Sequence, residues 1–163
     1  MCGIVGYVGP RRARALLLAG LEKLEYRGYD SAGISVLNGD HVDAVRAVGN
    51  LSHLRDAIAR REAAGAPSAP ATATALADPP RDQTGIGHTR WATHGRVTEE
   101  NAHPHYDTTD SVHIVVNGIV ENYIALKARL VQDGAVFTSE TDAEVIAHLV
   151  AHHYDGDLLT AVR

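Results

Sequence analysis

The first residue able to carry out chemistry is Cys2, the only cysteine in a chain of 163 residues. Because a small residue at the second position favours removal of the initiator methionine, Cys2 would carry both a thiol and a free α-amine. An α-amine has a pKa of about 8 and a thiol one of about 8.5, so a nucleophile and a base of suitable strength would lie on one residue. The alternative is an ordinary buried thiol in a first strand, since free cysteine is often buried.

A second candidate is the segment from Arg90 to Gly95, Arg-Trp-Ala-Thr-His-Gly, which ends a predicted strand. The planar guanidinium of an arginine can hold a carboxylate through paired hydrogen bonds. A tryptophan in a glycine-flanked loop can cover a ligand. The alternative is a surface arginine beside a core tryptophan, and the hexapeptide alone does not separate the two interpretations.

The third candidate is an oxyanion site at Asn117 and Gly118, which follow an apolar segment. The asparagine side chain and the glycine backbone N–H could both donate to a developing negative charge. Losing one such donor typically costs about 2.7–4 kcal/mol of transition-state stabilisation. The alternative is a type I′ hairpin turn, the common meaning of Asn-Gly between strands. A helical pattern follows instead of a second strand, which favours the oxyanion interpretation.

Asp142 is the fourth candidate and lies at the expected start of a helix. The sequence Thr-Asp-Ala-Glu at 141–144 has a capping-box pattern. A carboxylate at this position could bind the ammonium group of a ligand. The alternative is a favourable interaction with the helix dipole, worth about 0.3–1 kcal/mol, and Asp142 in isolation favours that alternative.

A metal site would have to use the histidines His88, His94, His103 and His105. The His-Pro-His spacing is not the i, i+4 pair of a helical zinc site, and the sequence has neither His-Glu-x-x-His nor a cysteine cluster. No Gly-x-Ser-x-Gly motif marks a serine nucleophile. We therefore expect no metal and no cofactor, and a histidine-rich metal binder is the least favoured alternative.

The elements that must position these residues follow from the hydrophobic pattern. Strands are predicted at 3–8, 32–37, 41–48, 85–90, 112–116 and 135–137. Helices are predicted at 10–24, 51–62, 119–132 and 141–150, with a further helix after 157. Asn38-Gly39 predicts a hairpin, and Asn50 and Asp157 are predicted N-caps. The stretch 96–110 is expected to lack regular structure.

Length, composition and charge describe one domain spanning residues 1–163, with a low-complexity mobile insertion at 63–83 that is rich in Ala, Pro and Thr. The net charge is −5, and no basic patch with interleaved aromatics indicates nucleic acid. No apolar run reaches the roughly 18 residues needed to span a bilayer, so no membrane partner is expected. The single cysteine and the lack of a secretory signal favour the cytoplasm.

Four segments, in this order, resemble a known family: 1–6 (MCGIVG), 24–33 (LEYRGYDSAG), 88–95 (HTRWATHG) and 139–142 (SETD). Together they are similar to the glutaminase domain of glutamine–fructose-6-phosphate aminotransferase, a class II N-terminal-nucleophile amidotransferase. The resemblance covers nearly the whole chain outside 63–83. It implies an α+β fold, the four-layer αββα sandwich of N-terminal-nucleophile hydrolases.

The resemblance also implies the reaction and its machinery. Glutamine would be hydrolysed to glutamate and ammonia through a γ-glutamyl thioester on Cys2, with the α-amine as base. Asn117 and Gly118 would stabilise the oxyanion. Arg27 would hold the N-terminal segment near the nucleophile. In the full-length enzyme the ammonia would be used to make glucosamine-6-phosphate from fructose-6-phosphate.

Recognition of the substrate follows from the same resemblance. Arg90 would hold the α-carboxylate of glutamine and Asp142 its α-ammonium, so that free glutamine is selected. Thr93 and His94 would line the pocket, and Trp91 would help to close it.

The sequence departs from the family in two places. Val116 stands where the family usually has histidine, which bears on the support of the oxyanion loop. The chain ends at Arg163, so we expect a sandwich truncated at its C-terminus, without its later strands and its sugar isomerase domain. The full-length enzyme would be a homodimer. The alternative function is a truncated, catalytically inert glutamine-binding module.

Overall fold

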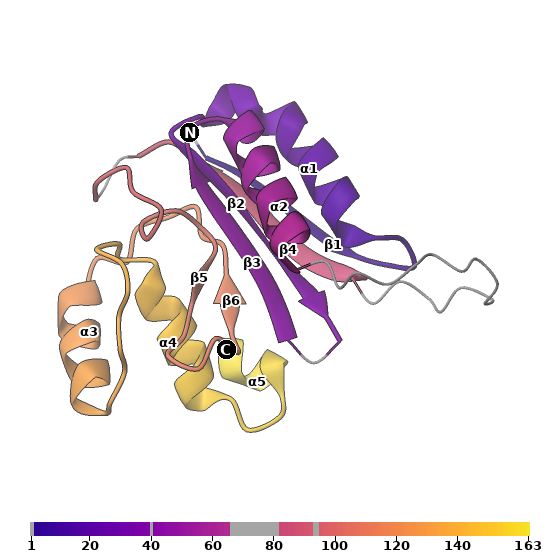
Figure 1. The fold of residues 1–163 in the computed structure, drawn as a ribbon. Helices are drawn as coiled ribbons and strands as arrows, with labels where there is room; N and C mark the ends of the chain where they lie inside the picture. The colour runs from indigo at the N-terminus through magenta and orange to yellow at the C-terminus, as the bar shows by residue number, and fades with distance from the viewer. Residues whose placement is uncertain (1, 40, 66–81, 93–94) are drawn as a thin grey trace.

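The chain folds into four layers, in the order helix, sheet, sheet, helix (Figure 1). The computed structural model describes residues 2–39, 41–65, 82–92 and 95–163. In chain order, the elements are β1 (Gly3–Val8), α1 (Ala13–Leu24), the 3₁₀ helix η1 (Glu25–Arg27), β2 (Ser31–Asn38), β3 (His41–Val48), α2 (Leu51–Gly65), β4 (Thr84–Arg90), β5 (His105–Tyr106), β6 (His113–Ile114), α3 (Tyr123–Gln132), α4 (Glu144–His153) and α5 (Leu158–Val162).

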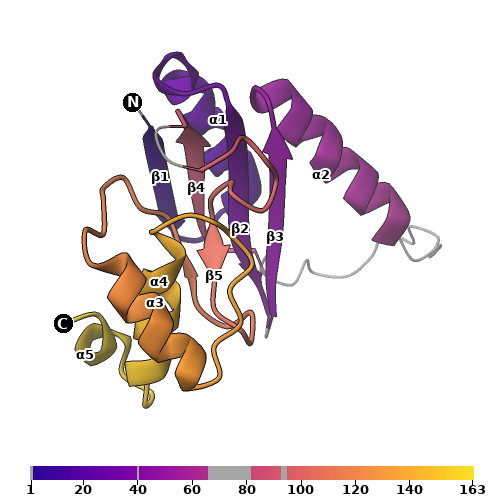
Figure 2. The ribbon, with the colours of Figure 1, turned by 90° about the vertical axis from the view of Figure 1, so that its left-hand side faces the viewer.

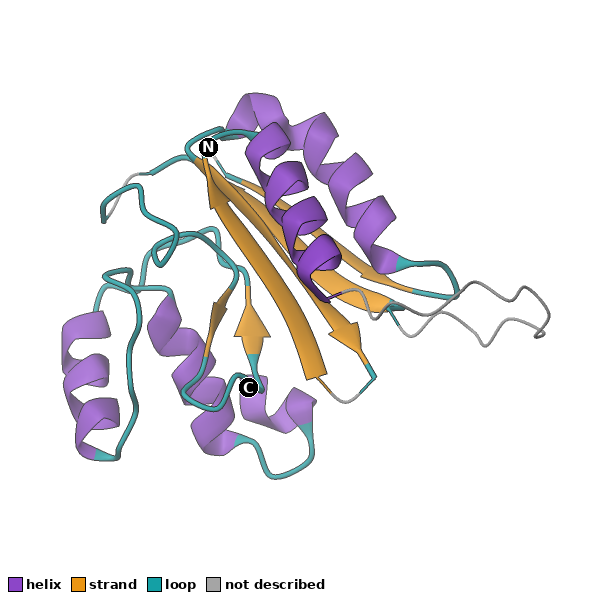
Figure 3. Ribbon diagram, in the orientation of Figure 1, coloured by secondary structure: helices purple, strands orange, loops and turns teal. Residues whose placement is uncertain are grey.

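The larger sheet is antiparallel and has the strand order β1-β4-β2-β3, which Figure 2 shows from left to right. Helices α1 and α2 cover one of its faces. The two-stranded sheet β5-β6 lies against the other face, and α4 packs on the outside of β5 and β6. Figure 3 shows the loops that follow β4 and precede α3 and α4 running between the N-terminal end of β1 and these outer helices.

The apolar core lies between the larger sheet and its two helices. Leu17 and Leu21 of α1 and Leu54 of α2 are completely buried, and they pack with Ile34 and Val36 of β2. Alternate residues of a strand point to opposite faces, so this apolar set defines the helix-facing side. Burying each large side chain contributes about 1.5–3 kcal/mol.

The opposite face of the same strands is polar and meets the second sheet. Ser35 of β2 makes a 3.0 Å hydrogen bond with Nδ1 of His113. A Cβ on Gly33 would lie 2.2 Å from the carbonyl oxygen of His103, so only glycine allows the layers to approach this closely. His88 and Arg90 of β4 lie on this polar face, and the site is built around them.

Several predicted elements are confirmed. Strands β1 and β3 have the predicted bounds, and the Asn38-Gly39 hairpin joins β2 to β3, with Asn38 paired to His41 and Gly39 at φ +71°. Asp157 caps α5 by accepting the N–H of Leu159 at 3.0 Å. These features depend on local pattern and turn chemistry, which the sequence carries directly.

Other predicted elements are wrong or shifted. Residues 135–137 form no strand, and the N–H of Val136 donates instead to the Thr108 hydroxyl at 2.9 Å. Strand β6 covers only two of the five residues predicted at 112–116, and α3 begins at Tyr123 rather than at 119. The residues between them form a loop held by side chains of other segments. Strand β5 lies inside the stretch 96–110, which was expected to be irregular.

The ends of two helices also differ from prediction. Helix α1 begins at Ala13, three residues after Pro10, and α2 continues to Gly65, so residues 63–65 are helical. The rest of the predicted insertion lies outside the described residues as far as 81. Asp82 and Gln83 are fixed, because the carbonyl of Asp82 accepts the N–H of Ala13 at 2.6 Å. Within the described ranges, no helix is long and apolar enough to cross a membrane.

Candidate active site

Cys2 lies immediately before β1 and next to the end of β4. The pairing of Gly3 with Thr89 and of Ile4 with His88 brings the start of β1 alongside Arg90. The backbone N–H of Trp91 donates to the Cys2 Sγ at 3.4 Å. The Cys2 thiol in turn can donate to the Trp91 carbonyl oxygen, 3.7 Å away. The predicted nucleophile is therefore held at the strand ends rather than buried in the apolar core.

A cavity of about 60 Å³ opens beside Cys2 and gathers residues from segments far apart in the sequence. It is lined by Cys2, Arg90, Trp91, His103, Val116, Asn117, Gly118, Thr141, Asp142 and Ala143. Six of the residues predicted from sequence thus meet in one place. Thr93 and His94 lie outside the described residues, and Arg27 does not line the cavity.

Arg90 is almost completely buried, with 5% of its surface exposed. Its Nη1 donates to the carbonyl of Arg96 at 3.1 Å. Burial lowers the pKa of Arg90, while the nearby Cys2, Asp30 and Asp142 raise it. A guanidinium stays charged in proteins, so this cavity has a fixed cation on one wall and the Asp142 carboxylate on another.

The Asn117-Gly118 loop is tied to the site by three hydrogen bonds. Asn117 Nδ2 donates to the Cys2 carbonyl at 3.3 Å. The N–H of Val116 donates to His103 Nδ1 at 3.4 Å, and that of Val120 to Asp142 Oδ2 at 2.7 Å. Because β6 ends at Ile114 and a helix follows, Asn-Gly does not form the alternative hairpin turn between strands.

Three buried histidines form a stack behind this loop. The ring centroids of His88 and His103 lie 4.2 Å apart, and those of His103 and His105 lie 4.3 Å apart. Burial and the charge of Arg90 lower the pKa of His88 to about 4. Burial and the neighbouring imidazoles also lower the pKa of His103. A neutral His103 can accept the Val116 N–H, so it supports the Asn117-Gly118 loop.

The histidine stack does not form a metal centre. Within the ranges that the structure describes, no three His, Cys, Asp or Glu side chains are arranged to hold a metal ion. His105 instead uses Nε2 for a 2.9 Å hydrogen bond with the Thr141 hydroxyl, on the wall of the cavity.

The segment from Gly28 to Asp30 was missed as part of the site by sequence reasoning. A Cβ on Gly28 would lie 2.7 Å from the carbonyl carbon of Arg90, so this position requires glycine. The Asp30 carboxylate accepts the N–H of Ala92 at 2.8 Å. Arg27 ends the 3₁₀ helix that precedes this segment. The available signal was the cluster Tyr-Arg-Gly-Tyr-Asp-Ser, which supported the family resemblance as part of segment 24–33 but of which only Arg27 was given a role in the site.

The predicted capping box at 141–144 is wrong. Helix α4 begins at Glu144 and has no side-chain cap at its N-terminus. Glu144 turns back and accepts the backbone N–H groups of Thr138 and Ser139, each at 2.7 Å. Asp142 does not cap α4. Its carboxylate instead accepts the Val120 N–H, so its role is more than an interaction with the helix dipole. Glu144 fixes the chain that leads into the cavity wall.

Glu144 should make stability depend on acid pH. Burial alone would raise its pKa, but hydrogen bonds from His148, Ser139 and Thr138 outweigh burial and lower the pKa from 4.5 to about 2. A lowered carboxyl pKa stabilises the fold above pH 4.5, and that stabilisation is lost as pH falls toward 2. The shift corresponds to roughly 3 kcal/mol. The free energy of unfolding in urea is measured at pH 7 and at pH 3. We expect the difference between these two values to be much smaller in Glu144→Gln than in the unmodified chain.

The exposed Glu121 provides the control for this measurement. Glu121→Gln should unfold like the unmodified chain at both values of pH. Equal pH dependence in Glu144→Gln and Glu121→Gln would contradict the role of the buried carboxylate.

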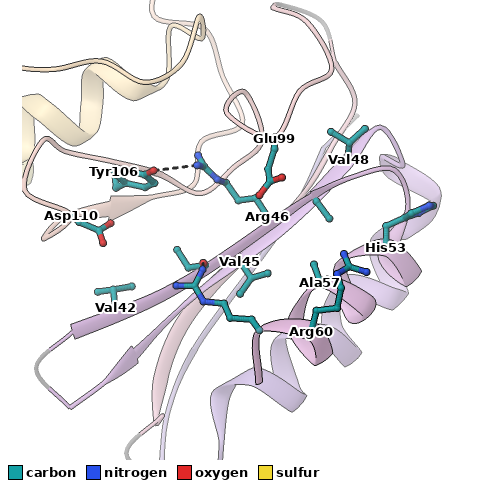
Figure 4. Close-up of a pocket in the computed structure, with 13 residues that line it drawn as sticks. Val42, Val45, Arg46, Val48, His53, Ala57, Arg60, Glu99, Tyr106 and Asp110 are labelled. Atoms are coloured by element: carbon teal, nitrogen blue, oxygen red, sulfur yellow. Dashed lines mark hydrogen bonds between the residues drawn. The ribbon is translucent and has the colours of Figure 1, made fainter. Parts of the chain in front are cut away.

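A larger cavity, of about 470 Å³, lies along the edge strand β3 and contains none of the predicted site residues (Figure 4). Arg46 reaches across it to the Tyr106 hydroxyl at 3.2 Å, and Arg60 and Asp110 lie on its walls. Neither a thiol nor an oxyanion loop faces this cavity. Six of the residues predicted to form the site instead line the smaller cavity beside Cys2.

The Cys2 thiol, the charges of Arg90 and Asp142 and an Asn-Gly loop lie together on an αββα scaffold, an arrangement typical of N-terminal-nucleophile amidotransferases. The family model described as glutamine amidotransferase domain matches residues 76–161. The chain belongs to this glutamine amidotransferase family, as its resemblance predicted.

Relatives and solved structures agree with this membership. Glutamine–fructose-6-phosphate aminotransferases from Symbiobacterium thermophilum and Aquifex aeolicus are 49% and 47% identical over 100% and 99% of this chain. The chain spans 24% of the length of each. The glutamine phosphoribosylpyrophosphate amidotransferase from B. subtilis, solved with ADP and GMP, matches 99% of this chain and 31% of its own, with a TM-score of 0.70 and 25% identity. A regulatory enzyme of purine biosynthesis matches with a TM-score of 0.71. The predicted four-layer fold is confirmed.

Proposed function

We propose that this chain hydrolyses the side-chain amide of free glutamine, with Cys2 as the nucleophile. The observation that carries the proposal is the convergence of Cys2, Arg90, Asp142 and the Asn117-Gly118 loop on one small cavity. Free glutamine carries a carboxylate and an ammonium on one carbon, so a buried cation and a carboxylate at fixed separation select it over a glutamine side chain in a peptide. Thr93 and His94 are proposed to complete the pocket.

The mechanism uses the sulfur and the loop in two half-reactions. The Cys2 thiolate attacks the amide carbon and forms a tetrahedral oxyanion, which the Asn117 amide and the Gly118 N–H stabilise. Ammonia leaves as the carbonyl re-forms, giving a γ-glutamyl thioester. Water then attacks the thioester through a second oxyanion at the same donors and releases glutamate. With Met1 removed, the Cys2 α-amine takes the thiol proton and passes a proton to the leaving ammonia.

The longer relatives indicate a use for the ammonia. They are named glutamine–fructose-6-phosphate aminotransferases, so we propose that it serves to make glucosamine-6-phosphate from fructose-6-phosphate in a longer homodimeric protein with a sugar isomerase domain. Because a reactive thiol survives best under reducing conditions, we place this protein in the cytoplasm. Arg27, next to the Gly28 contact with β4, is proposed to hold the N-terminal segment.

The decisive experiment measures glutamate release from glutamine by protein whose intact mass shows that Met1 has been removed. Release above the level of a Cys2→Ala control supports the proposal. Binding of glutamine without release by the Met1-free protein would establish the alternative, an inert glutamine-binding module. A mass that still includes Met1 identifies a preparation whose free amine is on the wrong residue, and it is processed with methionine aminopeptidase before the assay.

Arg90→Lys should weaken glutamine binding strongly. A lysine ammonium cannot reproduce the paired hydrogen bonds of a guanidinium with a carboxylate. We expect the KM for glutamine to rise about tenfold or more, consistent with the loss of one charge-assisted hydrogen bond, while kcat falls less.

The matched control is Arg12→Lys, because Arg12 is exposed and pairs with Asp82 at 3.8 Å, away from the cavity. That variant should keep the unmodified KM. An unchanged KM in Arg90→Lys would remove Arg90 from substrate recognition.

A further inference from the structure

Both backbone groups of Trp91 face the Cys2 sulfur. Its N–H lies 3.4 Å from Sγ and its carbonyl oxygen lies 3.7 Å from Sγ. A thiol can donate to the carbonyl, whereas a thiolate can only accept, and the N–H is then its partner. One residue thus offers a hydrogen bond to the sulfur in each protonation state.

The two peptide groups that flank Trp91 are both held by Asp30. The Asp30 backbone N–H donates to the Arg90 carbonyl at 3.1 Å, and the Asp30 carboxylate accepts the Ala92 N–H at 2.8 Å. In a planar trans peptide, N–H and C=O point in opposite directions. Holding the Arg90 carbonyl therefore turns the Trp91 N–H away from Asp30, and holding the Ala92 N–H turns the Trp91 carbonyl the same way, toward Sγ.

The neighbours of Asp30 keep the two segments together. Gly28 lies so close to the Arg90 carbonyl carbon that a Cβ would be 2.7 Å from it. The Tyr29 ring meets the Trp91 ring edge-on, with centroids 5.3 Å apart. Residues 28–30 therefore contact residues 90–92 through backbone, side-chain and ring contacts. Among these described contacts, only Asp30 makes hydrogen bonds to both peptide groups that flank Trp91.

We propose that Asp30 is a positioning residue for the nucleophile, which aims the Trp91 N–H and carbonyl at the Cys2 sulfur. Its consequence for turnover rests on the proposed function. Its consequence for the sulfur does not, because a better-stabilised thiolate reacts faster with any alkylating agent. The direction of the change in alkylation rate distinguishes two effects of replacing Asp30. Removing its negative charge would by itself favour the Cys2 thiolate, whereas losing the hydrogen bond from the Trp91 N–H disfavours the thiolate.

The test is the rate at which iodoacetamide alkylates Cys2 at pH 7, followed by intact mass and located by peptide mapping. Asp30→Ala should slow alkylation about tenfold, as expected for one lost hydrogen bond to a charged group. Asp30→Asn loses the same charge but keeps an acceptor for the Ala92 N–H, so its rate should stay within about threefold of the unmodified chain. The control Asp157→Ala removes a carboxylate that accepts a backbone N–H in α5, and its rate should be unchanged.

Equal or faster alkylation in Asp30→Ala overturns the proposal, and so does an equal slowing in Asp30→Ala and Asp30→Asn. Circular dichroism first verifies that each variant is folded. If Asp30→Ala is unfolded, Asp30→Glu replaces it, because the glutamate carboxylate is displaced by one methylene. Slower alkylation of Cys2 in Asp30→Glu than in Asp30→Asn supports the proposal. Equal or faster alkylation overturns it. Unmodified protein that is alkylated in the expected pattern but releases no glutamate would refute the proposed function alone.

Discussion

Replacing Cys2 by alanine should abolish glutamate release, with kcat falling by at least about 10⁴-fold, as is typical when a catalytic nucleophile is removed. Among the described residues of the cavity wall, Cys2 supplies the only thiol. The only hydroxyl there belongs to Thr141, and it is engaged with His105 at 2.9 Å. The measurement is glutamate formed from glutamine under single-turnover and steady-state conditions.

Binding provides the control for this variant. The charges of Arg90 and Asp142 remain in Cys2→Ala, so calorimetry should give a Kd for glutamine within about threefold of the unmodified protein, since little of the binding free energy depends on the sulfur. Residual turnover near the unmodified rate would contradict nucleophilic catalysis by Cys2. Loss of both binding and fold would be detected by calorimetry and circular dichroism, and Cys2→Ser would then take its place.

The pairing of β1 with β4 explains why the sequence could suggest candidate site residues but not their arrangement. Both strands were predicted from short apolar patterns, yet the contact between Gly3 and Thr89 joins positions far apart in the chain. Local periodicity contains no information about such pairing. The motifs, through their resemblance to a family, were what placed Cys2 beside Arg90.

Asp30 and Glu144 make contacts that the sequence analysis did not predict. Glu144 was assigned a local role in a capping box, because Asp and Glu commonly act on neighbouring backbone, and Asp30 was noted only as part of the segment 24–33. In the structure Asp30 holds the Ala92 N–H, and Glu144 holds the segment that precedes its own helix. Long-range acceptors of this kind depend on packing between segments, so single-sequence patterns underestimate them.

Asn117→Ala should reduce kcat about 10²–10³-fold with little change in KM, the typical effect of losing one oxyanion donor. In the structure Asn117 Nδ2 lies 3.3 Å from the Cys2 carbonyl, which uses one of its two N–H groups. The second N–H is the one proposed to donate to the oxyanion. Ground-state glutamine bears little charge on its amide oxygen, so the interaction strengthens only as the oxyanion forms.

Asn117→Asp separates donation from anchoring. Its shape is the same, but an ionised aspartate only accepts hydrogen bonds, so the loss in kcat should match or exceed that of Asn117→Ala. Asn122→Ala is the matched control, because Asn122 is exposed and its side chain makes no capping hydrogen bond to α3. If Asn117→Ala raised KM while leaving kcat intact, Asn117 would belong to substrate binding, and the Gly118 N–H would have to stabilise the oxyanion with a different partner.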